Sequence, residues 1–313
     1  MIRDRNIAAD ASINPSKIMG GGVWYPASET YYVSRNVGAS GDGLSLRTAF
    51  KTIGEAVAKV NADYTAGTSN ANNKGRLRRI VVSEGWYSEI PLTLTANDVH
   101  IVGVAPGNHD SIVLYGSATA GGYDITSGGP ALTLQGSNCT IENMGFFTYD
   151  ALYPSLSIGA ASVSVYGNKI LNCSFVRDVA DGSIGGIADY GADGSVVEGC
   201  FFSTSCKDYG IKLLSNGVIN PVNARYINNL FIGTPIGIHQ TAGHNTYIAF
   251  NTFLDDSSDR ADTIDNPCYV DGSSAYMYKN FAPMNTLAEF NGGAAGVELA
   301  NICSDSAAAN YPA

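Results

Sequence analysis

The sequence predicts an all-β solenoid, a three-sided parallel β-helix, from three observations. A six-residue unit that opens on an apolar residue and closes on Phe recurs along the chain. Successive closing Phe residues are 29, 26, 30, 22 and 28 residues apart, within the roughly 20 to 50 residues that are typical of solenoids and propellers. Short apolar runs separated by Gly, Asn, Asp and Ser surround each unit, without the helical periodicity of an α-solenoid.

The spacing selects one solenoid type. A four-stranded propeller blade needs about 40 residues or more, whereas one coil of a parallel β-helix fits the observed period. Inward side chains of such a coil stack on their equivalents one coil later, about 4.8 Å away. We therefore expect an internal aromatic column of Phe146, Phe175, Phe201, Phe231, Phe253 and Phe281. A second inward column would contain Ile141, Ile170, Val196, Tyr226, Ile248 and Tyr276.

Asparagine is frequent in the unit, where it suits a left-handed corner between strands and a hydrogen-bonded side-chain ladder. The residues concerned are Asn143, Asn172, Asn228, Asn251 and Asn280.

One amphipathic helix precedes the repeats. After the N-cap candidate Ser45, apolar residues recur at three- and four-residue spacings, which predicts a helix near 46–64. An open solenoid end exposes core and strand edge, so we expect this helix to cap the first coil. The chain then divides into an N-terminal arm and hinge over 1–30, a β-helix over 31–290, and a C-terminal coil or tail over 291–313.

Composition restricts the function classes. The chain of 313 residues has 18 basic and 28 acidic side chains, a net charge of −10, which argues against binding nucleic acid through phosphates. No apolar run has the length of a signal-peptide core or a membrane span, so we expect neither. The six cysteines have no metal-site spacing and are expected to be free thiols, with no metal and no cofactor bound. They are Cys139, Cys173, Cys200, Cys206, Cys268 and Cys303.

No catalytic constellation is predicted. A carbohydrase on this scaffold needs two outer carboxylates separated by about 5 to 9.5 Å. Asp178 and Asp256 each follow a closing Phe by three residues, but three coils would separate them, or about 14 Å. The acidic stretch 255–265 lacks calcium-loop spacing and is predicted to be solvated loop charge. His239 and His244 lack a partner at metal-ligand spacing.

The order of elements from Tyr31 to Phe290 resembles the pectin lyase-like family of right-handed parallel β-helices. The resemblance rests on the opening strand Tyr32-Val33, the capping segment 48–53 and the Asn-containing rungs. It implies a fold rather than a function, because this scaffold carries lyases, hydrolases, esterases, phage tailspikes and proteins without catalysis. The polygalacturonase pattern is not reproduced, since the paired Asp at 255–256 follows the segment 243–245 instead of preceding it.

The N-terminal arm resembles the leading segments of phage virion fibre and decoration proteins, which carry the pattern Ile-x-x-x-Ala-x-Ile-x-x-x-Lys-Ile. Apolar side chains on an extended arm need a partner surface. The expected partner contacts are Ile2, Ile7, Ile13, Lys17 and Ile18. A disordered tail or an added strand of the β-helix is the alternative interpretation.

We therefore expect a non-enzymatic bacteriophage virion protein, either a capsid decoration protein or head fibre, or a component of a tail fibre or spike. It would be made in the host cytoplasm without a signal peptide and docked by its arm on capsid, vertex or tail proteins. The β-helix would be displayed for stability or for adhesion to host polysaccharide. The alternative function is a tailspike-like polysaccharide depolymerase or lyase, and a pure glycan-binding module is a third.

Tyrosines at turns and strand ends are candidate glycan contacts, because the ring supplies contact area while the hydroxyl stays hydrated. They are Tyr149, Tyr153, Tyr190 and Tyr209. Scattered surface tyrosines without a common role are the equal alternative. A homo-oligomer such as a trimer is left open.

Overall fold

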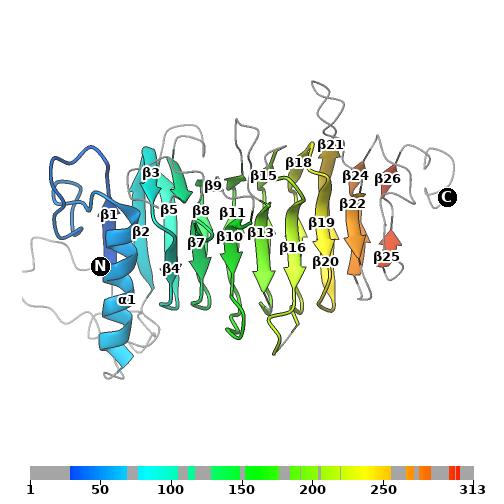
Figure 1. The fold of residues 1–313 in the computed structure, drawn as a ribbon, viewed down its shortest axis with the longest axis horizontal. Coiled ribbons are helices and arrows are strands. Elements are labelled where there is room, and N and C mark those ends of the chain that lie inside the picture. The colour runs from blue at the N-terminus through cyan, green and yellow to red at the C-terminus, as the bar shows by residue number, and fades with distance from the viewer. Residues whose placement is uncertain are drawn as a thin grey trace, which may run out of the picture.

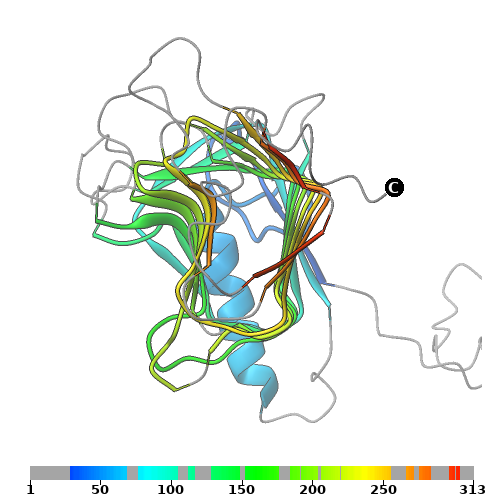
Figure 2. The ribbon, with the colours of Figure 1, turned by 90° about the vertical axis from the view of Figure 1, so that its right-hand side faces the viewer.

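In the computed structural model, the described residues form three parallel sheets that wind into a parallel β-helix, together with one α-helix (Figure 1). Figure 2 looks along the axis of the β-helix and shows the sheets surrounding a common interior. The buried side chains in this interior form one hydrophobic core. The architecture is consistent with the right-handed form that the sequence predicts. The structure describes residues 29–68, 77–104, 112–116, 128–148, 152–175, 184–190, 192–203, 206–218, 220–254, 266–270, 275–282, 296–299 and 301–303.

Each complete coil contributes one strand to each sheet, and we name the sheets A, B and C. Sheet A contains β1 Glu29–Val33, β2 Arg78–Ser83, β5 Val99–Val104, β8 Thr140–Glu142, β11 Lys169–Leu171, β14 Val196–Glu198, β17 Arg225–Ile227, β20 Thr246–Ala249, β23 Ala275–Tyr278 and β25 Gly296–Leu299. Sheet B contains β3 Gly85–Glu89, β6 Ile112–Gly116, β9 Gly145–Thr148, β12 Ser174–Phe175, β15 Phe201–Phe202, β18 Leu230–Ile232, β21 Thr252–Leu254, β24 Phe281–Ala282 and β26 Ile302–Cys303. Sheet C contains β4 Leu92–Leu94, β7 Leu132–Leu134, β10 Pro154–Ile158, β13 Gly185–Tyr190, β16 Tyr209–Leu214, β19 Ile236–Gln240 and β22 Asn266–Val270.

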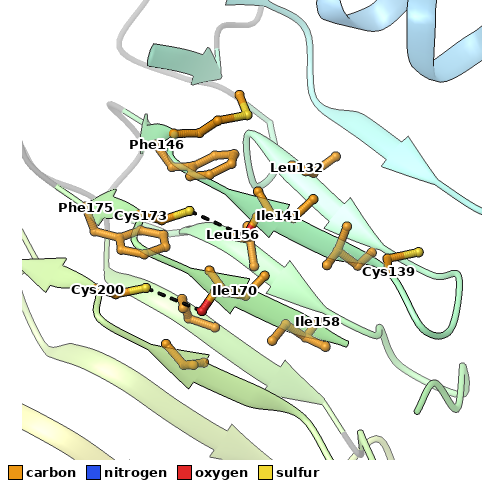
Figure 3. Close-up of a cluster of buried hydrophobic side chains, with 14 of the residues drawn as sticks. Leu132, Cys139, Ile141, Phe146, Leu156, Ile158, Ile170, Cys173, Phe175 and Cys200 are labelled. Carbon is orange, nitrogen blue, oxygen red and sulfur yellow. Dashed lines mark hydrogen bonds between the residues drawn. The ribbon is translucent and has the colours of Figure 1, made fainter. Parts of the chain in front are cut away.

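The predicted aromatic column exists, with two corrections. Successive rings are stacked with centroids 4.7 to 5.8 Å apart, and Figure 3 shows the first two of them. The column consists of Phe146, Phe175, Phe202, Phe231 and Phe253. Phe201 was the wrong choice, because its neighbour Phe202 points inward and is fully buried. Phe281 was also wrong: it is 39 % exposed, and Ala282 takes the inward position.

The second column needs the same one-residue correction in the same two coils. Val197 and Met277 are fully buried in register with Tyr226 and Ile248, so the expectations for Val196 and Tyr276 were wrong. The unit keeps its six-residue length, and alternation along a strand turns the residue before each inward position outward.

Glycines of sheet C make room for the aromatic column. A Cβ atom added to Gly210 would lie 2.5 Å from the Phe231 ring. The same relation joins Gly186 to Phe202 and Gly237 to Phe253. In the next coil the buried Pro267 follows Gly237 in register, and Ala282 takes the place of Phe. In three coils a glycine of sheet C therefore faces a phenylalanine of sheet B. In the fourth coil the larger residue, Pro267, is in sheet C and the smaller residue, Ala282, is in sheet B.

The corners between sheets A and B divide the predicted asparagines into two roles. Asn143, Asn172 and Asn228 adopt the left-handed conformation, with φ between 50 and 56°. Asn251 and Asn280 were predicted there too, but they lie one position later and form a buried ladder. In this ladder each side-chain amide donates to the next side-chain oxygen at 3.0 Å, through Asn229, Asn251, Asn280 and Asn301.

The helix α1 spans Ile53–Thr68 and starts later than the predicted residue 46. Thr52 and Glu55 form a reciprocal capping box: Glu55 N donates to Thr52 Oγ1 at 3.1 Å, and Thr52 N donates to Glu55 Oε2 at 3.0 Å. Ser45 Oγ instead accepts from Thr48 N in a preceding turn. The buried helix residues Ile53, Ala56, Val57 and Val60 join the core of the first coils, so the helix covers the N-terminal end (Figure 1).

Five cysteines have described side chains, and all five are free and buried, as predicted: Cys139, Cys173, Cys200, Cys206 and Cys268. Within the described part of the chain, no helix has the length and apolar character needed to cross a membrane.

Candidate functional site

A surface cleft of about 460 Å³ lies beside the N-terminal end of α1. Arg35 and Lys51 contribute cationic walls, and Trp86 is 49 % exposed at its edge. The buried Glu89 also lines the cleft. The remaining lining residues are Thr52, Gly54, Tyr87, Ser88, Ile90 and Leu92.

The carboxylate of Glu89 caps the helix. Its two oxygens accept hydrogen bonds from the backbone N–H groups of Ile53 and Gly54, both at 2.6 Å. The helix dipole favours a negative charge at this end. Burial nevertheless raises the pKa of Glu89, against the opposing effect of these two hydrogen bonds. Both carboxylate oxygens are therefore engaged in capping the helix.

A second carboxylate near the cleft, that of Glu55, also stabilises the start of α1. Partial burial alone would raise the pKa of Glu55, but hydrogen bonds from Ser40, Thr52 and Lys51 outweigh it and hold the pKa below its ordinary value. Glu55 and Glu89 both stabilise the start of α1, which does not suit them as a general acid and base. The cleft has the chemistry of a binding site, with two cations and an exposed indole.

A second polar cluster lies inside the β-helix. Asp189 is completely buried, and its carboxylate accepts hydrogen bonds from the hydroxyls of Ser195 and Tyr226 and from Ala192 N. Desolvation by burial raises the pKa of Asp189 to about 6, and the hydrogen bonds reduce that rise. Ser195 and Tyr226 are also buried, so a bound substrate has no access to the cluster.

The outer face of sheet A places polar side chains in register along the helix axis. One row runs through Arg79, His100, Thr140, Lys169, Val196, Arg225, Tyr247 and Tyr276. His100 Nε2 lies 3.0 Å from Glu142 Oε2 in the neighbouring row. This pair is partly exposed and contributes little to stability.

The structure does not bring the candidate tyrosines together. Tyr153 precedes β10 and Tyr190 ends the neighbouring strand β13, so they lie at opposite ends of these two strands, about 20 Å apart. Both are partly exposed. Tyr209 is only 4 % exposed, with the Lys212 ammonium 5.3 Å from its ring centre, which leaves little of the ring for a ligand. Tyr149 lies outside the described residues.

Other predicted features also fall outside the described part of the chain. These are the arm contacts Ile2, Ile7, Ile13, Lys17 and Ile18, together with Asp178, Asp256 and the acidic stretch 255–265. Among the residues that are described, no group of three or more His, Cys, Asp or Glu could hold a metal ion. The His239 ring packs edge-on against Tyr269, with centroids 5.0 Å apart.

Sequence reasoning missed the cleft because it did not predict strand β3. The segment 85–89 alternates between inward Tyr87 and Glu89 and outward Trp86 and Ser88. An inward Glu beside an outward Trp reverses the usual hydrophobic pattern. This reversed pattern in the segment 85–89 is the sequence feature that could have indicated the cleft.

The comparisons with known proteins agree on the fold. No protein-family model and no curated protein matches the chain. Among solved structures, ORF18 of Geobacillus virus E2 has a TM-score of 0.55 at 14 % identity, over 87 % of this chain and 50 % of that one. This chain therefore spans half the length of the virus chain.

Two further similar structures are a pectate lyase and a tailspike protein. Pectate lyase Pel9A has a TM-score of 0.45 at 15 % identity, over 92 % of this chain and 82 % of that one. The Dettilon tailspike protein (gp208) has a TM-score of 0.42 at 12 % identity, over 88 % of this chain and 61 % of that one. At these identities the likeness concerns the fold alone. The predicted resemblance to pectin lyase-like parallel β-helices is confirmed.

Proposed function

We propose that this chain is a structural protein of a bacteriophage particle, attached by its N-terminal arm and displaying the β-helix for adhesion to the host surface. The proposal treats the chain as a rigid spacer with a binding surface, not as an enzyme. Its support comes from the fold, from the arm sequence and from the similarity to a virus chain.

The observation that carries the proposal is the uninterrupted stack of strands. Sheet A continues through ten parallel strands from β1 to β25. At about 4.8 Å per step, this corresponds to roughly 43 Å of β-helix. The arm precedes β1 in the chain, so attachment through the arm would leave the far end of the stack free.

The viral similarity supports the setting. The solved structure with the TM-score of 0.55 is a virus chain, and a tailspike shares the same fold. The carboxylates beside the cleft also serve the fold, because Glu55 and Glu89 stabilise the helix end. The second point counts against a depolymerase that uses this cleft.

Deletion of residues 1–22 tests attachment. The shortened chain is expected to fold, because the described core begins at Glu29, and to be lost from purified particles. Circular dichroism of the shortened chain controls for folding, and immunoblotting of particles measures incorporation. Incorporation at the level of the full chain would rule out anchoring by the arm.

A further inference from the structure

Aromatic side chains gather on sheet A toward its C-terminal end, on the strands next to β20, which is labelled in Figure 1. Arg225, Tyr247 and Tyr276 follow one another in register on the outer face of β17, β20 and β23. Two coil steps separate the first from the last, or about 10 Å. Tyr276 is 48 % exposed.

The adjoining corner adds more rings. Phe250 is 44 % exposed and meets the partly exposed Tyr278 edge to face, with centroids 5.6 Å apart. The Lys279 ammonium lies 5.1 Å from the centre of the Tyr278 ring. We call the whole surface the aromatic corner, and it comprises Arg225, Tyr247, Phe250, Tyr276, Tyr278, Lys279 and Phe281.

Two of these residues have a backbone conformation that does not suit them. Phe250 and Lys279 have φ angles of 57° and 51°. The four preceding corners use Asn or Gly at the equivalent position, namely Asn143, Asn172, Gly199 and Asn228. Asn and Gly adopt positive φ readily, whereas a bulky side chain there is strained. Such strain often accompanies a functional surface.

The charge of the aromatic corner opposes that of the whole chain. The chain has a net charge of −10, yet the seven residues include two cations and no acid. Arginine and lysine bind carboxylate, sulfate or phosphate groups through charge-assisted hydrogen bonds. An anionic partner is therefore complementary to this surface.

The size of the surface favours a small or narrow ligand over a protein. Aromatic side chains offer about 150 to 250 Å² each, and the three most exposed rings are 39 to 48 % exposed. The five rings together present roughly 200 to 500 Å², below the ~800 Å² that each partner contributes to a standard protein interface. The in-register row suits an elongated ligand that lies along the helix axis.

We propose that the aromatic corner binds an acidic glycan, with sugar rings packed on the aromatic side chains and acidic substituents paired with Arg225 and Lys279. This inference rests on the proposed function and specifies where adhesion takes place. The site lies on sheet A and its corner with sheet B, away from Tyr153 and Tyr190 on sheet C.

The test measures binding of the full chain to a panel of purified acidic and neutral bacterial capsular polysaccharides by biolayer interferometry. We expect the parent chain to bind at least one acidic polysaccharide of the panel. The affinity for that polysaccharide should be at least tenfold weaker for Tyr276→Ala and for Lys279→Asn. Because Asn adopts positive φ readily, Lys279→Asn is expected to keep or raise the thermal midpoint. Loss of binding by this variant then cannot result from unfolding.

Tyr166→Ala, at a tyrosine outside the aromatic corner that is 55 % exposed, is the matched control and should leave the affinity unchanged. No binding to any acidic polysaccharide, or equal affinity of the parent and both variants, would overturn the inference. Self-association of the chain that Tyr276→Ala abolishes, without glycan binding, would also overturn it in favour of a subunit contact. Particle incorporation of the same variants is measured in parallel. Normal incorporation without glycan binding refutes this site and leaves the anchoring role intact.

Discussion

Asp189 is a completely buried carboxylate whose side-chain partners, Ser195 and Tyr226, are uncharged hydroxyl groups. Its pKa is raised to about 6 in the folded chain, from about 3.9 in an unfolded one. The folded state therefore retains a proton that the unfolded state loses between these two values. The free energy of unfolding should fall as pH rises from about 4 to 6, by about 3 kcal/mol from this group alone.

The variant Asp189→Asn tests that dependence. We expect it to reduce the fall in stability between pH 4 and 6, because the amide does not titrate. Urea unfolding at pH 4, 5, 6 and 7 measures the effect, and Asp193→Asn at an exposed neighbouring position is the control. An unchanged pH slope in Asp189→Asn would contradict the assigned titration.

Residue-level prediction from the sequence failed where two neighbouring residues were chemically equivalent. Val196-Val197 and Phe201-Phe202 each allow two registers, and only the complete coil decides which member points inward. The aromatic corner was missed because the sequence assigned the register of its coil one residue too early. Once Met277 and Ala282 occupy the inward positions, Tyr276 and Phe281 turn outward.

At the scale of elements, the contact between glycine and phenylalanine defines how sheets B and C pack. Gly210→Ala should destabilise the chain by about 1 to 3 kcal/mol, because the new methyl group meets the Phe231 ring and, at 2.7 Å, the Gly237 carbonyl oxygen. Phe231→Ala should cost about 3 to 5 kcal/mol by leaving a cavity. The double variant should lose less than the sum, as the exchange at Pro267 and Ala282 suggests.

Denaturant unfolding of the three variants measures this coupling. Gly38→Ala, at an exposed glycine whose added Cβ would meet no atom within 4 Å, is the control for the glycine-to-alanine change itself. Strict additivity of Gly210→Ala and Phe231→Ala would contradict the proposed packing.

The helix shows which element features were predictable. Its existence and capping role followed from periodicity and from the open end of the solenoid. Its start was readable in the capping box of Thr52 and Glu55, which was overlooked in favour of Ser45. The cap from Glu89 was not readable, because it joins backbone groups 35 and 36 residues away through the folded first coil.

At the scale of the whole molecule, periodicity alone predicted the architecture, because every coil repeats the same burial. Function depends on surfaces that periodicity does not specify. The cleft at Trp86 and the aromatic corner both arise where the chain departs from its repeat. The regular coils of the β-helix lie between these two surfaces and hold them apart.

Electron cryomicroscopy of the intact phage particle tests the central claim most directly. The account predicts a rod of density about 43 Å long, fitted by the β-helix with its Glu29 end toward the particle and its aromatic corner distal. Absence of the chain from purified particles, or a rod attached by its C-terminal end, would contradict it.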